Sequence, residues 1–153
     1  MPDELGPTRR GFVMGAGAAV AASTVSAASG GVSFGVIGTG GQGCYLLGRM
    51  ARLAGCRCVA VADVYEPNLK RGVAAAGSKP QAFADYRKLL ERKDVEAVVV
   101  ATPLSTHFPI TRDALEAGKH VFCERPLVFK REELQALRAV AEARPNQVVQ
   151  VGL

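Results

Sequence analysis

The sequence predicts an α/β fold built on one parallel, six-stranded sheet, and three observations predict it. Short apolar runs alternate with amphipathic segments from residue 32 onward. A glycine cluster follows the first of these runs at 38–43. The run at 95–101 is almost continuously apolar, which is typical of a strand buried on both faces of a parallel sheet. Right-handed crossovers then give a doubly wound sheet with the strand order 3-2-1-4-5-6.

Each expected element follows from a local pattern. Strands are expected where apolar runs stand between turn residues, at 32–37, 59–62, 82–83, 95–101, 120–123 and 147–151. Helices are expected in the intervening segments, at 42–54, 67–76, about 86–92, 107–117 and 130–143. The first and last helices carry an apolar side, formed by Leu46, Leu47, Met50, Leu53 and Ala54 and by Leu134, Leu137, Val140 and Ala141. Gly118 is expected to end the helix at 107–117.

The composition is that of a globular protein with a net charge of +5. Its 153 residues, of which 48% are hydrophobic and 22% charged, are enough for one domain with a short appendage. The 19 Lys and Arg and the 14 Asp and Glu include no run of five like charges. This spread predicts a solvated surface and argues against nucleic-acid binding, which needs clustered positive charge.

The amino-terminal 27 residues are typical of an export signal. Residues 11–31 carry no charge and are rich in Ala, Gly and Ser, with small residues near position 27 that suit a signal peptidase. The stretch is too weakly apolar for a stable membrane span. A twin-arginine signal is matched by Thr8, Arg9, Arg10 and Phe12, whereas Val13 and Met14 depart from its last two positions. We expect export to the periplasm by the twin-arginine machinery, with anchoring if the signal is uncleaved. A flexible tail with two chance arginines is the alternative.

The glycine cluster is the strongest chemical signal. Gly38-Thr39-Gly40-Gly41-Gln42-Gly43 is a G-x-G-x-x-G motif between the first strand and the first helix. Gly38 suits the tight turn, Gly40 admits a pyrophosphate, and Gly43 permits close packing of helix on strand. The helix start adds free N–H groups and a positive dipole for phosphate oxygens.

Asp63 turns this motif into a prediction of dinucleotide binding. It follows Gly43 by 20 residues and ends the second strand, where a carboxylate can bind both ribose hydroxyls of an adenosine. The carboxylate also repels a 2′-phosphate, which favours NAD over NADP. Lys70 and Arg71 lie beyond it and are expected to form a solvated helix face; a softening of the choice between NAD and NADP is the alternative. The fold is therefore expected to be a Rossmann domain over 32–153.

Two further motifs carry a family resemblance. Ala101-Thr102-Pro103-Leu104-Ser105-Thr106-His107 follows the fourth strand, and Ala114-Leu115-Glu116-Ala117-Gly118-Lys119-His120-Val121-Phe122-Cys123-Glu124-Arg125-Pro126-Leu127 spans the fifth. Together with the glycine loop, these ordered motifs resemble the oxidoreductases of the glucose–fructose oxidoreductase, inositol dehydrogenase and rhizopine protein (Gfo/Idh/MocA) family. The resemblance covers about residues 32–151.

The resemblance implies a larger α/β domain after the Rossmann domain, which holds a sugar-like substrate and usually the oligomer interface. It also implies that Thr102, Pro103, Leu104 and His107 line the nicotinamide side of the cofactor and that Glu124 contacts the nicotinamide ribose. Taken alone, a histidine at a helix start is more often a capping or surface residue. His120 is expected to be structural.

Two departures from the family limit the expected chemistry. The family normally has Glu-Lys-Pro after the fifth strand, where the lysine positions or deprotonates the reacting hydroxyl, and this chain has Glu124-Arg125-Pro126. Arginine stays protonated, so Arg125 is no general base, although it can hold a substrate oxygen. A cofactor-adjacent residue without catalytic role is the alternative. The second departure is that the chain ends at Leu153, without a substrate domain.

The sequence as a whole predicts the NAD-binding domain of an exported Gfo/Idh/MocA-type oxidoreductase that acts on sugar or cyclitol hydroxyls. Two alternatives remain: an NAD-dependent glycoside hydrolase of the same family and a non-enzymatic nucleotide-binding module. Whether this chain alone is an enzyme stays open. A metal site is not expected, because the four cysteines lack Cys-x-x-Cys spacing and nearby histidines; they are expected to be buried, reduced thiols.

Overall fold

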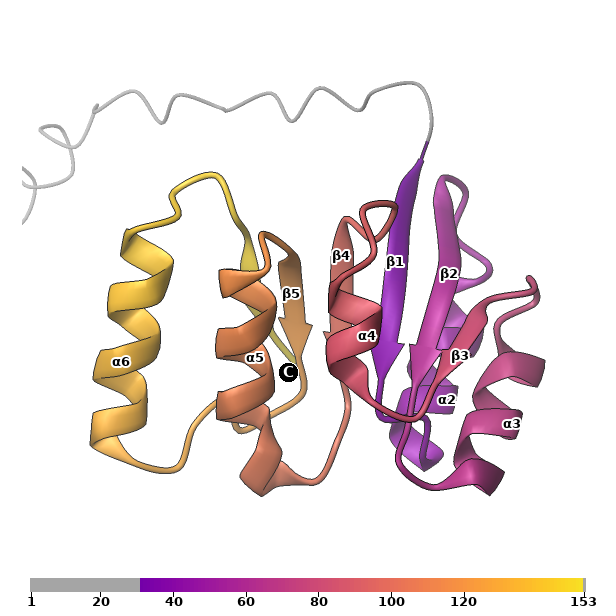
Figure 1. The fold of residues 1–153 in the computed structure, drawn as a ribbon, viewed down its shortest axis with the longest axis horizontal. Coiled ribbons are helices and arrows are strands. Elements are labelled where there is room, and N and C mark those ends of the chain that lie inside the picture. Colours follow the sequence, from indigo (N-terminus) through magenta and orange to yellow (C-terminus); the bar gives the residue numbers. More distant parts are fainter. Residues whose placement is uncertain (1–30, 153) are drawn as a thin grey trace, which may run out of the picture.

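The computed structural model describes residues 31–152 and confirms the predicted sheet (Figure 1). Its strands are β1 (Val32–Ile37), β2 (Cys56–Ala62), β3 (Gln81–Phe83), β4 (Ala97–Val100), β5 (His120–Cys123) and β6 (Val149–Val151). Its helices are α2 (Gly41–Met50), α3 (Glu66–Ala75), α4 (Tyr86–Leu90), α5 (His107–Glu116) and α6 (Arg131–Glu142), with a short 3₁₀ turn, η1, at Leu104–Thr106. The strand order is β3-β2-β1-β4-β5-β6, as predicted.

All neighbouring strands pair in parallel, so their carboxyl ends meet at one edge of the sheet. The chain leaves β1 to one side for β2 and β3 and returns to the other side for β4, β5 and β6. This makes the gap between the ends of β1 and β4 the point where the strand order reverses. Open α/β sheets bind their ligands at such a point.

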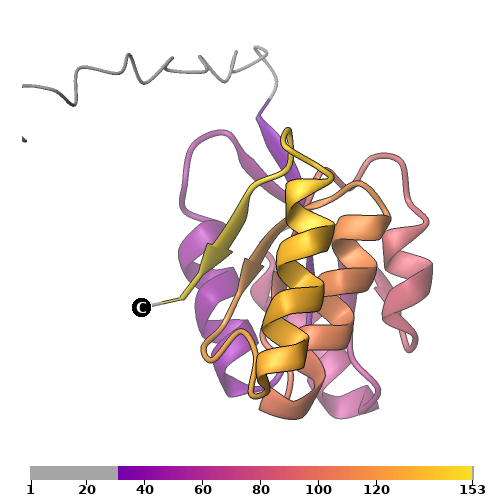
Figure 2. The ribbon, with the colours of Figure 1, turned by 90° about the vertical axis from the view of Figure 1, so that its left-hand side faces the viewer.

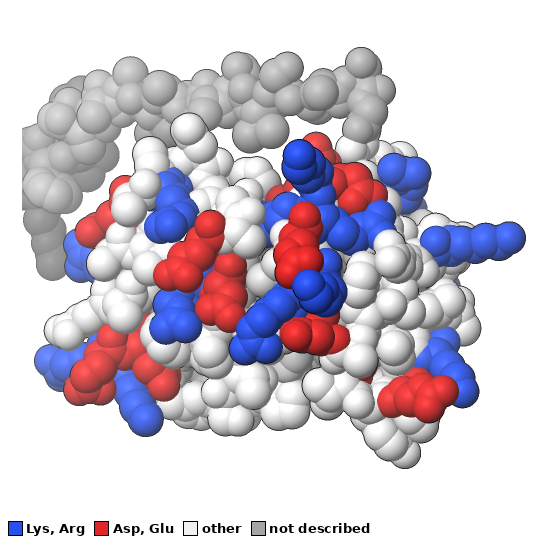
Figure 3. Space-filling view, in the orientation of Figure 1, with Lys and Arg blue, Asp and Glu red and all other residues white. Residues whose placement is uncertain are grey.

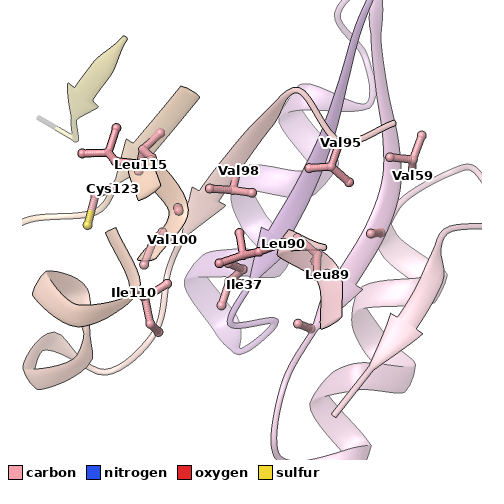
Figure 4. Packing of buried hydrophobic residues seen from close by; sticks show 14 of the residues in the cluster. Ile37, Val59, Leu89, Leu90, Val95, Val98, Val100, Ile110, Leu115 and Cys123 are labelled. Atoms are coloured by element: carbon pink, nitrogen blue, oxygen red, sulfur yellow. The ribbon is translucent and has the colours of Figure 1, made fainter. Parts of the chain in front are cut away.

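Helices cover both faces of the sheet, and each face has its own core. Helices α4, α5 and α6 lie on one face and α2 and α3 on the other (Figures 1 and 2). Strand β4 shows the alternation: Val98 and Val100 belong to the core under α4–α6, and Val99 belongs to the core under α2 and α3. Figure 4 shows the first of these cores, where Leu89 and Leu90 of α4 face the strands. Strands buried on both faces explain the near-continuous apolar runs in the sequence.

Two helix faces differ from the prediction. Helix α2 ends at Met50 rather than 54, because the chain turns through Gly55 at a φ of 81° to enter β2. Leu53 therefore lies in the turn and is 57% exposed instead of joining the apolar side of the helix. On α6, Leu137 is buried as expected, whereas Leu134, one turn earlier on the same stripe, is 53% exposed. Gly118, at a φ of 80°, follows α5 as predicted.

Charged groups of both signs are mixed on the face that carries α4–α6. Figure 3 shows Lys and Arg next to Asp and Glu over this face. Ion pairs such as Arg138–Glu142 and Lys88–Glu91 account for part of this mixing. Between residues 31 and 152, no helix is both long enough and apolar enough to cross a membrane. The predicted export signal at 1–27 lies outside the described residues.

Candidate nucleotide-binding site

The glycine loop joins β1 to α2 and owes its shape to two glycines without room for a side chain. Gly38 has a φ of 89°, and a Cβ there would lie 2.6 Å from the Ala101 carbonyl oxygen. A Cβ on Gly43 would lie 1.8 Å from the Gly38 carbonyl oxygen, so α2 packs directly against the end of β1. Both positions therefore require glycine, for the tight turn and for the close helix packing that the motif predicts.

Gly40 and the start of α2 leave open space at the same loop. A Cβ on Gly40 would meet nothing closer than the side-chain nitrogen of Asn68, at 3.9 Å. Gly40 is also the N-cap of α2 and provides no side-chain cap. The N–H groups of the first turn, from Gly41 onward, thus point to an open space at the positive end of the helix dipole. This arrangement suits a pyrophosphate.

Asp63 is bound directly to the glycine loop. Its Oδ2 accepts a hydrogen bond of 2.8 Å from the Thr39 N–H, and its Oδ1 accepts one of 2.9 Å from the Tyr65 N–H. The Thr39 hydroxyl lies 3.4 Å from Oδ2. These bonds fix the carboxylate at the end of β2, beside the loop. Among the described residues Oδ1 accepts the Tyr65 bond alone, and a carboxylate oxygen has two lone pairs, so a ribose hydroxyl of an adenosine still finds an acceptor there.

Thr39 itself is a buried part of the loop. Its side chain is fully buried. A Cβ added at Gly72 of α3 would lie only 2.5 Å from the Thr39 methyl carbon. Its carbonyl oxygen accepts a bond of 3.1 Å from the Cys44 thiol. Burial raises the pKa of this thiol, against the opposing charge of Arg71. Thr39 therefore shapes the loop from inside, and Gly72, which the sequence analysis did not single out, makes room for it.

Helix α3 presents a polar chain behind Asp63. The Asn68 amide donates a bond of 3.3 Å to Asp63 Oδ2, and the Arg71 guanidinium donates to the Asn68 side-chain oxygen. Lys70 instead forms an exposed ion pair of 2.8 Å with Glu66. Arg71 is thus linked to Asp63 through Asn68, whereas Lys70 belongs to the solvated face of the helix.

A cavity of about 260 Å³ opens at the point where the strand order reverses. It is lined by Gly38 of the glycine loop, by Asp63 directly after β2, and by Thr102 and Pro103 of the loop after β4. Its remaining lining residues are Ile37, Ala62, Val64, Ala84, Tyr86, Thr106 and Ile110. Mostly apolar walls with a few polar groups are typical of small-molecule sites. A larger cavity of about 510 Å³ at Gly31 and Gly55 lies away from the carboxyl ends of the strands.

Sequence reasoning missed Tyr86, Thr106 and Ile110. The Tyr86 hydroxyl donates a bond of 2.7 Å to Asp113 Oδ2, which ties α4 to α5 beside the cavity. Burial and this bond raise the pKa of Tyr86 to about 12. One available signal was the helix start at Asp85, whose side chain caps α4 and so fixes Tyr86 as its first residue. For Ile110, the available signal was its position three residues after His107, on the next turn of α5.

Glu124 lies beside the glycine loop, although its strand is two away from β1. The Gln42 amide donates a bond of 2.8 Å to Glu124 Oε1. Arg125 and Pro126 follow and are exposed, and Leu104 is 48% exposed and outside the cavity lining. The structure thus brings Gln42 and Glu124 together at one end of the site. Thr102 and Pro103 share the cavity with Asp63, so their predicted place beside the nicotinamide stays a prediction.

His107 is buried instead of facing the cavity, with a relative exposure of 1%. Its ring nitrogens each lie 2.9 Å from a backbone carbonyl oxygen, one of Thr102 and one of Pro126. Direct contact between His107 and a cofactor therefore stays a prediction.

His120 is exposed on β5 and accepts the Val148 N–H at Nδ1, at 3.0 Å. All four cysteines are free; Cys58 and Cys123 are buried, whereas Cys44 and Cys56 are partly exposed.

Comparison with known proteins identifies the family. Residues 32–153 match the model of the Gfo/Idh/MocA oxidoreductase family, NAD-binding Rossmann fold. Inositol 2-dehydrogenase from Ralstonia nicotianae is 35% identical over 122 residues, which cover 79% of this chain and 36% of that protein. Glycosyl hydrolase family 109 protein 2 from Shewanella sp. (strain ANA-3) is 38% identical over 119 residues, covering 72% and 26%. The chain thus spans about a quarter to a third of the length of these relatives.

Solved structures agree with this match. The structure of scyllo-inositol dehydrogenase from Lactobacillus casei with bound NAD(H) and scyllo-inositol has a TM-score of 0.74 at 25% identity, covering 80% of this chain and 36% of that one. A 3-ketoreductase from Actinomadura kijaniata in complex with NADP and TDP-benzene has a TM-score of 0.72 at 31% identity, covering 80% and 37%. The glycine loop, the aspartate hydrogen-bonded to it and the cavity at the carboxyl ends of the strands agree with this match. The chain belongs to the Gfo/Idh/MocA oxidoreductase family and forms its NAD-binding Rossmann domain.

Proposed function

We propose that this domain serves an exported oxidoreductase that moves a hydride between NAD and a hydroxyl-bearing carbon of a sugar or cyclitol. The observation that carries the proposal is the hydrogen bond between Asp63 and the Thr39 N–H, because it places a ribose acceptor beside an open phosphate loop. The inositol 2-dehydrogenase relative supports the substrate class. The nicotinamide ring supplies the hydride chemistry when NAD is bound.

The residues of this chain divide the binding work along the edge of the sheet. Asp63 suits the adenosine ribose, and the first turn of α2 suits the pyrophosphate. The sheet order then directs the nicotinamide half toward β4 and β5, since β2 lies on the other side of β1. Glu124 stands there, held by Gln42. A reacting hydroxyl beside Arg125 would meet a permanent donor, so the proton has to leave through another group.

Calorimetry on the 153-residue chain tests whether it binds NAD and whether it prefers NAD to NADP. We expect NAD to bind and NADP to bind more weakly, because the Asp63 carboxylate repels a 2′-phosphate, while Arg71 keeps NADP binding measurable. Equal affinities would show that Asp63 does not read the ribose. If neither dinucleotide bound, both the oxidoreductase and the alternatives below would fail.

An NAD-dependent glycoside hydrolase is the second candidate, and the 38% identity with the glycosyl hydrolase family 109 protein favours it specifically. A full-length relative with the same Glu-Arg-Pro segment separates the two. Net accumulation of NADH on inositols or sugars supports the dehydrogenase. Release of the aglycone from a glycoside at catalytic amounts of NAD supports the hydrolase. A non-enzymatic module predicts NAD affinity with neither reaction.

Export is proposed on the sequence of residues 8–12 alone, Thr-Arg-Arg-Gly-Phe. Fusion of residues 1–31 to a reporter that is active only after twin-arginine export tests it. We expect activity in the periplasm and its loss when Arg9 and Arg10 are both replaced by Lys. Equal reporter activity in the fusion and its double variant would contradict a twin-arginine signal.

A further inference from the structure

The loop that follows β5 is held in place from two directions, and His107 provides one of them. The loop starts from the sheet, where the Glu124 N–H donates to the Val100 carbonyl at 2.9 Å. Arg125 and Pro126 come next and are exposed. Within residues 31–152, the contact of Pro126 with His107 is the hydrogen bond that links these two residues to another element. The position of Arg125 therefore depends on Glu124 before it and on His107 behind it.

The His107 ring reaches both loops that border the site. Its Nε2 lies 2.9 Å from the Thr102 carbonyl oxygen after β4, and its Nδ1 lies 2.9 Å from the Pro126 carbonyl oxygen after β5. A carbonyl oxygen only accepts, and a neutral imidazole carries a single N–H, so the tautomer decides which of the two contacts is a hydrogen bond. An N–H on Nδ1 gives the hydrogen bond to Pro126 and leaves the Thr102 contact without one. The ring is also packed at the start of α5 with almost no exposure, which leaves it little freedom to move.

The two contacts are not of equal consequence. Thr102 has a second tie, since its hydroxyl lies 2.8 Å from the Thr106 hydroxyl, and Thr106 also lies 2.6 Å from the Pro103 carbonyl oxygen. The loop after β4 is thus closed on itself by η1 and its threonines. The Arg125–Pro126 pair has no comparable tie in the described chain. Loss of the Nδ1 contact should therefore loosen the loop after β5, whereas loss of the Nε2 contact should not.

We propose that His107 is a positioning residue for the nicotinamide half of the site, and that it acts through its Nδ1 contact with the Pro126 carbonyl. It holds Glu124 and Arg125 where the dinucleotide needs them, without touching the cofactor itself. This inference rests on the proposed binding of NAD along the sheet edge. Asp63 and the glycine loop, which suit the adenosine and pyrophosphate, lie on elements that His107 does not bond.

Two amide substitutions distinguish the contribution of the His107 Nδ1 contact from that of the Nε2 contact. In His107→Asn the amide nitrogen occupies roughly the place of Nδ1, and in His107→Gln roughly the place of Nε2, so each keeps one donor. We expect His107→Gln to raise the Kd for NADH about tenfold, as for the loss of one buried hydrogen bond. The Kd for ADP should stay within about threefold of wild type. His107→Asn should stay within about threefold for both ligands.

The readouts are calorimetry with ADP and the fluorescence of bound NADH, which arises from the nicotinamide. His120→Gln is the matched control, because His120 is exposed at the amino end of β5, the edge of the sheet opposite the site, where its ring accepts the Val148 N–H; it should change neither Kd. A merely structural role would weaken ADP and NADH together and make the two His107 variants alike. Either result overturns the inference. Failure of the wild-type chain to bind NADH would instead overturn the proposed function.

A second measurement needs no variant, and it covers the case in which His107→Gln fails to fold. In labelled wild-type protein, NMR should show a scalar coupling across the hydrogen bond between His107 Nδ1 and the Pro126 carbonyl carbon. NADH, but not ADP, should shift the amide signals of Glu124 and Arg125 while this coupling persists. Absence of the coupling, or its loss when NADH binds, overturns the inference.

Discussion

The two ends of the nucleotide site are built differently. At the Asp63 end, a carboxylate bonds two backbone N–H groups, and the loop beside it has no room for a Cβ at Gly38 or Gly43. At the Glu124 end, two exposed residues follow the strand, and single side-chain bonds from Gln42 and His107 hold the segment. The first end is fixed by backbone and sterics, and the second by side chains that reach in from other elements.

This difference suggests a division of roles, in which the Asp63 end binds the dinucleotide and the Glu124 end borders the reacting groups. A rigid adenosine end can anchor the same dinucleotide whatever the reaction, because it is fixed by backbone N–H groups and by the lack of space for side chains in the glycine loop. An end held by a few side chains can be adjusted by single substitutions, for example at Arg125, the exposed residue that follows Glu124. The comparison predicts large effects of substitution on stability and affinity at the Asp63 end and small, ligand-specific effects at the Glu124 end.

Gly43→Ala should produce the largest effect. The new Cβ would lie 1.8 Å from the Gly38 carbonyl oxygen, which forces α2 away from β1. We expect a loss of about 3 kcal/mol in the free energy of unfolding and a rise of about 100-fold in the Kd for NAD. Urea unfolding and calorimetry measure the two. Gly48→Ala is the control, because a Cβ there meets nothing within 4 Å; it should stabilise α2 by about 0.5 kcal/mol. Equal behaviour of the two variants would refute the steric argument.

Asp63→Ala should come second. It removes the acceptor of the Thr39 and Tyr65 N–H groups together with the ribose acceptor. We expect about 2 kcal/mol of lost stability and a Kd for NAD about 30-fold higher. Glu66→Gln, an exposed change on α3, is the control and should alter stability by less than about 0.5 kcal/mol. An unchanged affinity in Asp63→Ala would remove this residue from the ribose site.

The sheet and the glycine–aspartate end could be predicted because they follow from local patterns. Apolar runs such as 95–101 locate strands, crossover handedness orders them, and a fixed spacing links Gly43 to Asp63. Helix ends were less predictable. Leu53 fits the apolar side of α2 in sequence, but the turn through Gly55 removes it from the helix, and that turn is set by where β2 has to begin.

The remainder of the site could not be predicted, because its contacts join segments far apart in the chain. Gln42 and Glu124 are 82 residues apart, and Tyr86 and Asp113 are 27 apart. No periodicity connects such pairs. His107 illustrates the limit further: the family motif marks the residue, but only the packing of α5 shows that its ring is buried and that its two nitrogens lie against backbone carbonyl oxygens.

Tyr86 lines the cavity together with Asp63, and the stability of this part of the site can be tested by pH. Burial and the bond to Asp113 raise its pKa to about 12, above its usual 10.0, so the folded state favours the neutral phenol. The stability that this provides is present below pH 10 and is lost as the pH rises toward 12. Tyr86→Phe should lose about 1 kcal/mol at pH 8. In urea unfolding from pH 8 to 11, wild type should fall toward the variant; parallel curves would contradict the assignment.

Gln42→Ala should give the smallest effect and is the most direct probe of the adjustable end. The variant frees the Glu124 carboxylate but touches no buried contact, because the bond between the two side chains is exposed. We expect unchanged stability within about 0.5 kcal/mol and a rise of about threefold in the Kd for NADH, with ADP unaffected. Gln150→Ala is the control, because within residues 31–152 the Gln150 side chain bonds only the neighbouring Val151 carbonyl. A loss of ADP affinity equal to that of NADH would show that Gln42 serves the pyrophosphate, and the site would then have one rigid unit rather than two ends.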